Sequence, residues 1–133
     1  MRIPLTAALC LAFFAGAPPL RGQQARPDSA AVASAARTLT RDLRQYVTAQ
    51  ENYYAAHRTY AGAAQATALK PSTDVTVIVL TFSSKGHNAV AIHRDVPGLV
   101  CAIWVGQKDA PPLDDRAEEG EPTCRLPGQP ISR

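Results

Sequence analysis

The clearest pattern in the sequence is a run of regularly spaced apolar positions between residues 28 and 60. They alternate between spacings of four and three and form what we call the helix stripe: Val32, Ala36, Leu39, Leu43, Tyr46, Gln50, Tyr53 and His57. Such spacing places side chains on one face of an α-helix, and the charged residues fall mostly off that face. Asp28 or Ser29 can cap the first turn. The pattern predicts one helix of roughly 30 residues that ends near Arg58 or Tyr60.

Two uses of the helix stripe fit this spacing. One is a coiled coil with a partner helix, and the other is packing on the protein's own sheet. The stripe becomes bulky only from Leu39 onward. We therefore expect the second half of the helix to pack on a sheet and the first half to project. Tyr53, Tyr54 and Tyr60 are interpreted as core or rim packing at the helix end, not as a binding platform.

A strongly apolar segment follows a connecting loop of small and polar residues at 59–73. In residues 74–82 the apolar side chains alternate, with Val75, Val77 and Val79 on one face and Ile78, Leu80 and Phe82 on the other. A strand that is apolar on both faces is usually central in a sheet or covered. We expect one of these two positions for this strand.

Two further strands follow, each preceded by a turn signal. Lys85 and Gly86 can turn the chain, and residues 87–94 then alternate as a second strand. Another turn precedes residues 99–105, which make a third strand, and the residues after Gly106 are read as loop. The predicted fold class is α+β, with one long helix followed by three short strands.

The first 22 residues have the pattern of an export signal. A short basic start precedes an almost wholly apolar run at 3–17, which is too short for a transmembrane helix of roughly 20 apolar residues. Gly22 is the expected cleavage position, which leaves residues 23–133 as one domain. Cys10 lacks the preceding small residues that lipid attachment needs. We expect an exported protein, periplasmic or extracellular, with no transmembrane anchor after cleavage; a retained N-terminal anchor is the alternative.

Export would place the remaining cysteines in an oxidising compartment, where disulfides form. Without Cys10 the mature chain holds only Cys101 and Cys124, and an even pair in an oxidising compartment is expected to close. A loop of this size contributes roughly 3 kcal/mol by the chain-entropy treatment. Removing Arg2 and Arg21 lowers the formal net charge from +3 to +1. A nearly neutral domain gives no electrostatic case for nucleic acid or for an anionic membrane.

Histidine is the first candidate for chemistry, because imidazole is a common metal ligand and a common base. His87 and His93 share one strand face but lie roughly 20 Å apart at the rise of a strand, so one metal cannot hold both. His57 could meet only one of them. We therefore expect no histidine metal site and interpret all three as solvated or rim residues.

An acidic cluster lies inside the loop that the cysteine pair would close: Asp114, Asp115, Glu118, Glu119 and Glu121. Calcium takes several oxygen ligands from flexible loops, but the ordered spacing of an EF-hand is missing here. A solvated acidic loop accounts better for the composition, so we predict no cofactor, with calcium as the alternative.

No residue combination predicts catalysis. Ser72, Ser83 and Ser84 lie in turns without a glycine-framed elbow, and no glycine-rich phosphate loop is present. The paired carboxylates lie only in a loop, whereas glycoside hydrolysis needs them at a fixed separation. We predict no catalytic residue and a protein that is not an enzyme.

Several phrases resemble the globular part of type IV pilins and type II secretion pseudopilins. The similarity runs through Leu43-Arg44, residues 47–51, Tyr53-Tyr54 and Thr59-Tyr60, then through the three apolar segments to Cys124. It covers roughly residues 39 to 124. The resemblance implies a long N-terminal helix packed on a small antiparallel sheet of three to four strands, with a C-terminal disulfide loop.

The chain also departs from that family. A pilin has a glycine cut by prepilin peptidase and then an apolar helix carrying a glutamate, whereas residues 28–38 here contain Asp28, Ser29, Ser34 and Arg37. Burying such charges in an apolar filament core is costly without partners. We therefore expect a soluble or surface-bound pilin-like domain instead of a pilus subunit.

Two functions remain as hypotheses. The first is a structural or protein-interaction module whose partner belongs to a pilus or secretion system, with oligomers among the forms to expect. Leu39, Leu43, Tyr46 and Tyr53 are its candidate interaction residues, because burial of the helix stripe would drive binding. The alternative is a periplasmic module that binds a small apolar ligand between helix and sheet.

Overall fold

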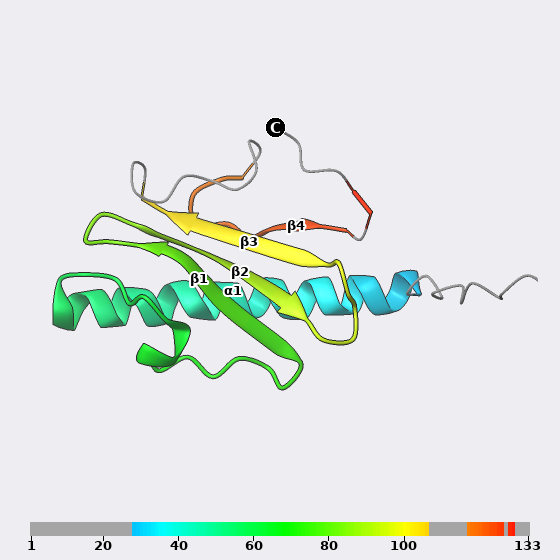
Figure 1. The fold of residues 1–133 in the computed structure, drawn as a ribbon, viewed down its shortest axis with the longest axis horizontal. Helices are drawn as coiled ribbons and strands as arrows, with labels where there is room; N and C mark the ends of the chain where they lie inside the picture. The colour runs from blue at the N-terminus through cyan, green and yellow to red at the C-terminus, as the bar shows by residue number, and fades with distance from the viewer. Residues whose placement is uncertain (1–27, 107–116, 127, 130–133) are drawn as a thin grey trace, which may run out of the picture.

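The computed structural model describes residues 28–106, 117–126 and 128–129, and it shows an α+β fold (Figure 1). One helix is followed by a short 3-10 turn and four strands: α1 (Ser29–His57), η1 (Ala64–Ala66), β1 (Val75–Phe82), β2 (His87–His93), β3 (Val100–Val105) and β4 (Thr123–Arg125). The strands form one antiparallel sheet in the order β1-β2-β3-β4. The predicted helix and the three predicted strands are confirmed to within a few residues at each end.

Both ends of α1 have a local cause. Asp28 caps the start, where its side chain accepts a hydrogen bond from the Ala30 N–H at 3.3 Å. At the other end Arg58 adopts the left-handed conformation with φ of 59°, and its N–H donates to the Tyr54 carbonyl at 2.8 Å. The chain reverses there with an arginine in the position that glycine usually takes.

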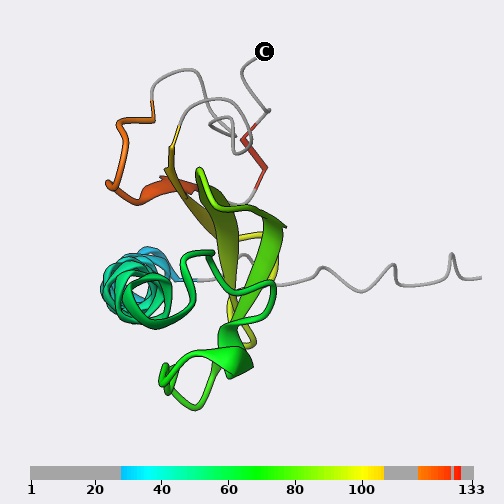
Figure 2. The same ribbon diagram turned by 90° about the vertical axis from the view of Figure 1, so that its left-hand side faces the viewer.

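The molecule has two layers, with α1 lying across one face of the sheet (Figure 2). The fully or nearly buried residues of α1 are Ala35, Leu39, Asp42, Leu43, Tyr46 and Gln50. The second half of the helix packs on the sheet as far as Gln50, as predicted, but the prediction that the first half projects is wrong, because Ala35 and Leu39 are also buried. His57, at the end of the helix stripe, is exposed, while Val32 and Ala36 are partly buried against the core.

The core lies between α1 and the inner face of the sheet. Its strand and loop members are Ala64, Val75, Val77, Ala89, Ala91, Val96, Leu99, Cys101 and Ile103. Ala89 and Ala91 on the inner face of β2 are small, which lets the helix approach the sheet closely. The coiled-coil alternative is not needed to bury the helix stripe, because the protein's own sheet does so.

The fourth strand was not predicted from the residues alone. β4 contains only three residues and pairs with β3, with Cys101 directly opposite Cys124. These two residues form a disulfide with an S–S distance of 1.99 Å, so the predicted pairing is confirmed. The Cys124 sulfur also lies 3.6 Å from the Thr40 hydroxyl on α1. The bridge thus holds a very short edge strand against β3, with its Cys124 end in contact with the helix.

β1 lies at an edge of the sheet, so the prediction that it is central or covered is wrong. A β-bulge interrupts its pairing with β2 between Val79 and Thr81. Because the extra residue shifts the alternation, Thr81 falls opposite Asn88 and Phe82 opposite His87. Phe82 then covers Gly62, where an added Cβ would lie only 2.5 Å from the phenyl ring. Only glycine allows the chain to pass beneath Phe82 without a shift of the ring.

Candidate functional site

The structure places the predicted interaction residues mainly in the core. Leu39, Leu43 and Tyr46 have no exposed surface, because all three face the sheet. Tyr53 is half-buried and stacks on the ring of His57 with 3.9 Å between ring centres. In this fold the helix stripe is therefore used for intramolecular packing, and a partner must meet other surfaces.

The same packing fills the position where the alternative function places a small ligand. The largest fully buried side chains between α1 and the sheet are Tyr46, Leu39, Leu43, Leu99 and Ile103. The described depressions lie elsewhere: one on the solvent side of α1, one between α1 and residues 68–70, and one between the η1 segment and β1. The interior of the described fold is thus occupied by the protein's own side chains.

Gln50 is the centre of a buried polar network at the end of α1. Its side-chain oxygen accepts from the Ala61 N–H at 2.8 Å, and its nitrogen donates to the Ala61 carbonyl at 2.9 Å. The same nitrogen donates to the Tyr46 hydroxyl at 2.9 Å. Because it satisfies both backbone groups of Ala61, Gln50 fixes the loop after α1 against the helix.

His87 extends this network into the sheet. Its Nδ1 lies 3.1 Å from the Tyr46 hydroxyl, and its side chain is completely buried, so its interpretation as a solvated or rim residue is wrong. Nε2 is buried without a hydrogen-bond partner among the described residues. Burial lowers the pKa of His87 to about 4 and raises that of Tyr46 to about 12. Both groups are therefore neutral near pH 7 and serve the packing of the core.

The aromatic residues at the end of α1 pack at the rim of the same network. The Tyr60 ring lies 4.8 Å from that of Tyr54 and 4.4 Å from that of His87. The Tyr60 hydroxyl donates to Glu51 at 3.0 Å, and burial together with this carboxylate raises the pKa of Tyr60 to about 12. The half-buried Tyr54 and Tyr60 thus take the predicted rim position.

A buried carboxylate on α1 was missed from the sequence. Asp42 accepts from the Ser72 N–H at 2.7 Å and from the Ser72 hydroxyl at 3.1 Å. The guanidinium of Arg41 lies 3.3 Å from the same carboxylate and also donates to Ser72 at 2.7 Å. The signal was available, because position 42 lies three residues after Leu39 and four before Tyr46, on the buried face. This cluster anchors the chain just before β1.

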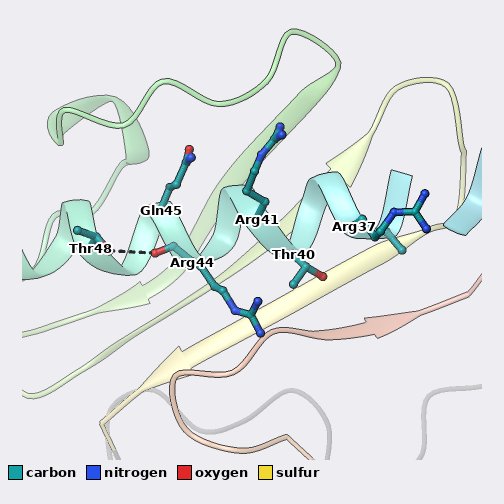
Figure 3. A pocket seen from close by; sticks show the side chains of 7 residues that line it. Arg37, Thr40, Arg41, Arg44, Gln45 and Thr48 are labelled. Carbon is teal, nitrogen blue, oxygen red and sulfur yellow. Dashed lines mark hydrogen bonds between the residues drawn. The ribbon is translucent and has the colours of Figure 1, made fainter. Parts of the chain in front are cut away.

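The solvent side of α1 carries an arginine-lined depression of about 530 Å³ (Figure 3). Its lining includes Arg37, Arg41 and Arg44. The side chains do not converge: Arg41 bonds Ser72 on one side, whereas Arg44 donates to Glu121 at 2.9 Å on the other. Arg41 and Arg44 thus connect α1 to neighbouring segments on opposite sides of the depression.

The acidic cluster lies only partly within the described residues. Asp114 and Asp115 fall outside them, while Glu119 accepts from the Gly106 N–H at 2.7 Å and Glu121 pairs with Arg44. The described part of the chain holds no group of three or more His, Cys, Asp or Glu residues that could bind a metal ion. Its helices also include none with the length and apolar character that a membrane crossing requires.

The feature that remains for binding is a line of large apolar side chains on the sheet, which we call the exposed apolar row. It consists of Ile78, Leu80, Phe82 and Ile92, whose exposed fractions are 41%, 48%, 54% and 39%. Three of them lie on β1 at the sheet edge. Ile78 and Ile92 lie on the outer face of the sheet, opposite the helix, whereas the bulge turns Phe82 toward the inner side at the edge. The sequence predicted Phe82 on the same face as Ile78, which is wrong because of the bulge, and it did not indicate that these large side chains stay exposed. Clusters of exposed apolar residues commonly mark binding surfaces.

Comparison with known proteins gives no further assignment: no protein-family model matches the sequence, and no curated protein matches it either.

Proposed function

We propose that this chain is an exported, non-enzymatic structural or protein-interaction module that resembles the head domain of a pilin or pseudopilin. The observation that carries the proposal is the exposed apolar row on an edge strand of an otherwise well-packed sheet. Four large, exposed apolar residues gathered on two neighbouring strands are unusual for a surface that only contacts water. Burial of such side chains against another protein is the interaction that the surface supports best.

The kind of partner follows from the compartment. The N-terminal export pattern and the disulfide both fit an oxidising environment outside the cytoplasm. In the periplasm or extracellular space the partner would be an envelope or secreted protein, with a pilus or secretion component favoured by the resemblance of residues 39–124. The arrangement of one helix across an antiparallel sheet with a C-terminal disulfide supports that resemblance at the level of architecture.

The role proposed is that of a soluble or surface-bound module outside the filament core. At the start of α1 the charged side chain of Arg37 is exposed, as are Ser29 and Ser34. A filament core would have to desolvate these groups, which costs several kcal/mol for an unpaired charge. The sheet surface can bind a partner without that cost.

Site-specific photo-crosslinking tests the proposal. A photoreactive side chain is placed at position 78 or 92 of the chain carrying its own N-terminal segment, and crosslinking is performed in the host that encodes it. We expect discrete adducts with an envelope protein, a secreted protein or a second copy. The matched control is position 56, where Ala56 is exposed on α1 away from the sheet. Absence of adducts at both sheet positions, or equal adducts from position 56, would contradict the proposal.

A further inference from the structure

β1 forms one edge of the sheet (Figure 1), and no strand among the described residues pairs with its outer side. The Asp74 carbonyl accepts from the Arg94 N–H at 2.9 Å, which fixes which residues of β1 bond to β2. Because bonding alternates along an antiparallel ladder, the N–H and C=O groups of Val77 and Val79 face away from β2. After the bulge the Ser83 N–H donates to Gly86, so the backbone groups of Phe82 also face outward.

The edge has little of the usual protection against pairing with another strand. Natural edge strands are commonly short, carry lysine, other charges or proline, or contain a β-bulge, and β1 has only the last of these features. Residues 75–82 contain no charged residue and no proline, and β1 is the longest strand of the sheet. The bulge between Val79 and Thr81 is its one irregular feature. By contrast, the opposite edge is formed by β4, which has three residues.

The strand matches itself when it is placed antiparallel to a second β1 with Val77 opposite Phe82. Both residues then point their backbone groups at each other, and both side chains lie on the inner face of the sheet. Ile78 falls opposite Thr81, and the side chains of both residues lie on the outer face of the sheet, opposite the helix. Paired side chains lie on the same face of the joined sheet only because the bulge shifts the inner–outer alternation of side chains along β1 by one residue.

Charge also favours this register. It places Asp74, just before β1, opposite Lys85, just after it, and the symmetry repeats this pair at the other end. Lys85 is exposed, and Asp74 is partly exposed beside Arg94. Opposite charges facing each other across neighbouring strands are stabilising, and like charges are destabilising.

A groove lies beside Val77, at the position that Phe82 of the second copy would reach in this register. The space beside Val75 and Val77 is bounded by the segment around η1 and has a volume of about 190 Å³; its lining is Ala64, Gln65, Leu69, Pro71, Val75, Thr76 and Val77. In the register described, Phe82 of the other copy arrives opposite Val77 on this inner face. An exposed aromatic side chain and a mostly apolar groove are thus supplied by the same strand and its neighbours.

We propose that two copies of this chain associate through antiparallel pairing of their β1 edges, which joins the two sheets into one. This inference rests on the proposed function, since it names a second copy as one partner of the exposed apolar row. The interface is small, so a dissociation constant on the order of 100 µM is expected, at the weak end for specific association.

Sedimentation velocity of the oxidised mature chain between roughly 10 µM and 1 mM tests the proposal, because this range brackets the expected dissociation constant. We expect a concentration-dependent monomer–dimer equilibrium. Leu80→Lys introduces a charge beside the symmetry axis and should weaken the dimer at least tenfold, while Ile92→Lys is the matched change on β2, away from the edge. Circular dichroism of both variants checks that they are folded.

A charge exchange provides a second readout that leaves the apolar residues intact. Lys85→Glu faces Asp74 with a like charge and should weaken the dimer several-fold, and adding Asp74→Lys should restore it. A chain that is monomeric at every concentration overturns the proposal, and so does a dimer that Ile92→Lys disrupts and Leu80→Lys does not. If the monomeric chain still gives the crosslinked adducts from position 78, self-pairing fails while the interaction function stands.

Discussion

At the scale of single residues, the buried polar groups decide how the loop after α1 is held. Gln50 satisfies both backbone groups of Ala61 inside the core. Gln50→Leu removes these partners while keeping the side chain's approximate size. We expect a loss of about 2–4 kcal/mol in the free energy of unfolding, because buried N–H and C=O groups would be left unpaired. Urea denaturation at pH 7 measures this loss.

The control for this change is Gln45→Leu, which is the same substitution at an exposed position of α1. It should alter stability by no more than about 0.5 kcal/mol. Equal effects of the two substitutions would show that Gln50 does not fix the loop.

His87 gives the molecule a predictable pH dependence. Burial lowers its pKa in the folded state to about 4, whereas the unfolded chain has the ordinary value of 6.5. Between these values the unfolded state binds more protons, so stability is complete above pH 6.5 and falls as the pH decreases toward 4. We expect a loss of roughly 2 kcal/mol between pH 7 and pH 5, measured by denaturant unfolding at each pH.

A substitution at this position isolates the effect of the imidazole. His87→Gln keeps a hydrogen-bonding side chain near Tyr46 but cannot titrate, so the slope of stability between pH 5 and pH 7 should become nearly flat. His57→Gln, at an exposed residue, should leave the slope unchanged. A slope that survives in His87→Gln would assign the titration to another group.

At the scale of secondary-structure elements, the alternation of apolar residues predicted where α1, β1, β2 and β3 lie. It could not predict their order in space, because a strand that is apolar on both faces reads the same at the centre or the edge of a sheet. β4 escaped detection since three residues are too few for a pattern. Gln50 fitted the helix stripe, whereas the spacing of Asp42 placed it on the buried face but could not indicate Ser72 as its hydrogen-bond partner, because Ser72 is distant in sequence.

The disulfide is the main device that holds β4 in place. β4 pairs with β3 over only three positions, and the disulfide from Cys124 to Cys101 is its covalent link to the sheet. Replacing both cysteines by serine should reduce stability by roughly 3 kcal/mol and expose the backbone amides of β4 first. Calorimetry measures the first effect and hydrogen exchange the second. Amides of β1 and β2 serve as the internal reference, and equally fast exchange across the whole sheet would argue against a local role of the bridge.

At the scale of the whole molecule, the single helix among the described residues packs on one face of the sheet, and it leaves Ile78 and Ile92 on the opposite face and the β1 edge exposed. A small domain has little core to spare, so the disulfide carries a large share of its stability. Because cysteines stay reduced in most cytoplasms, the proposed export would be the step that allows the bridge to form. If the proposal is right, a cleaved N-terminal segment and a closed bridge should be observed together.

Intact-mass analysis of the protein recovered from its host reads both properties in one measurement. We expect a chain that begins at Gln23, has no lipid on Cys10, and is about 2 Da lighter than the sum of its residues, since closing the bridge between Cys101 and Cys124 removes two hydrogens. Reduction should restore that mass. The same chain produced in a reducing cytoplasm without residues 1–22 is the control and should unfold at a lower temperature until it is oxidised. An intact Met1 or a lipid on Cys10 would contradict the proposal of an exported domain freed from its N-terminal segment.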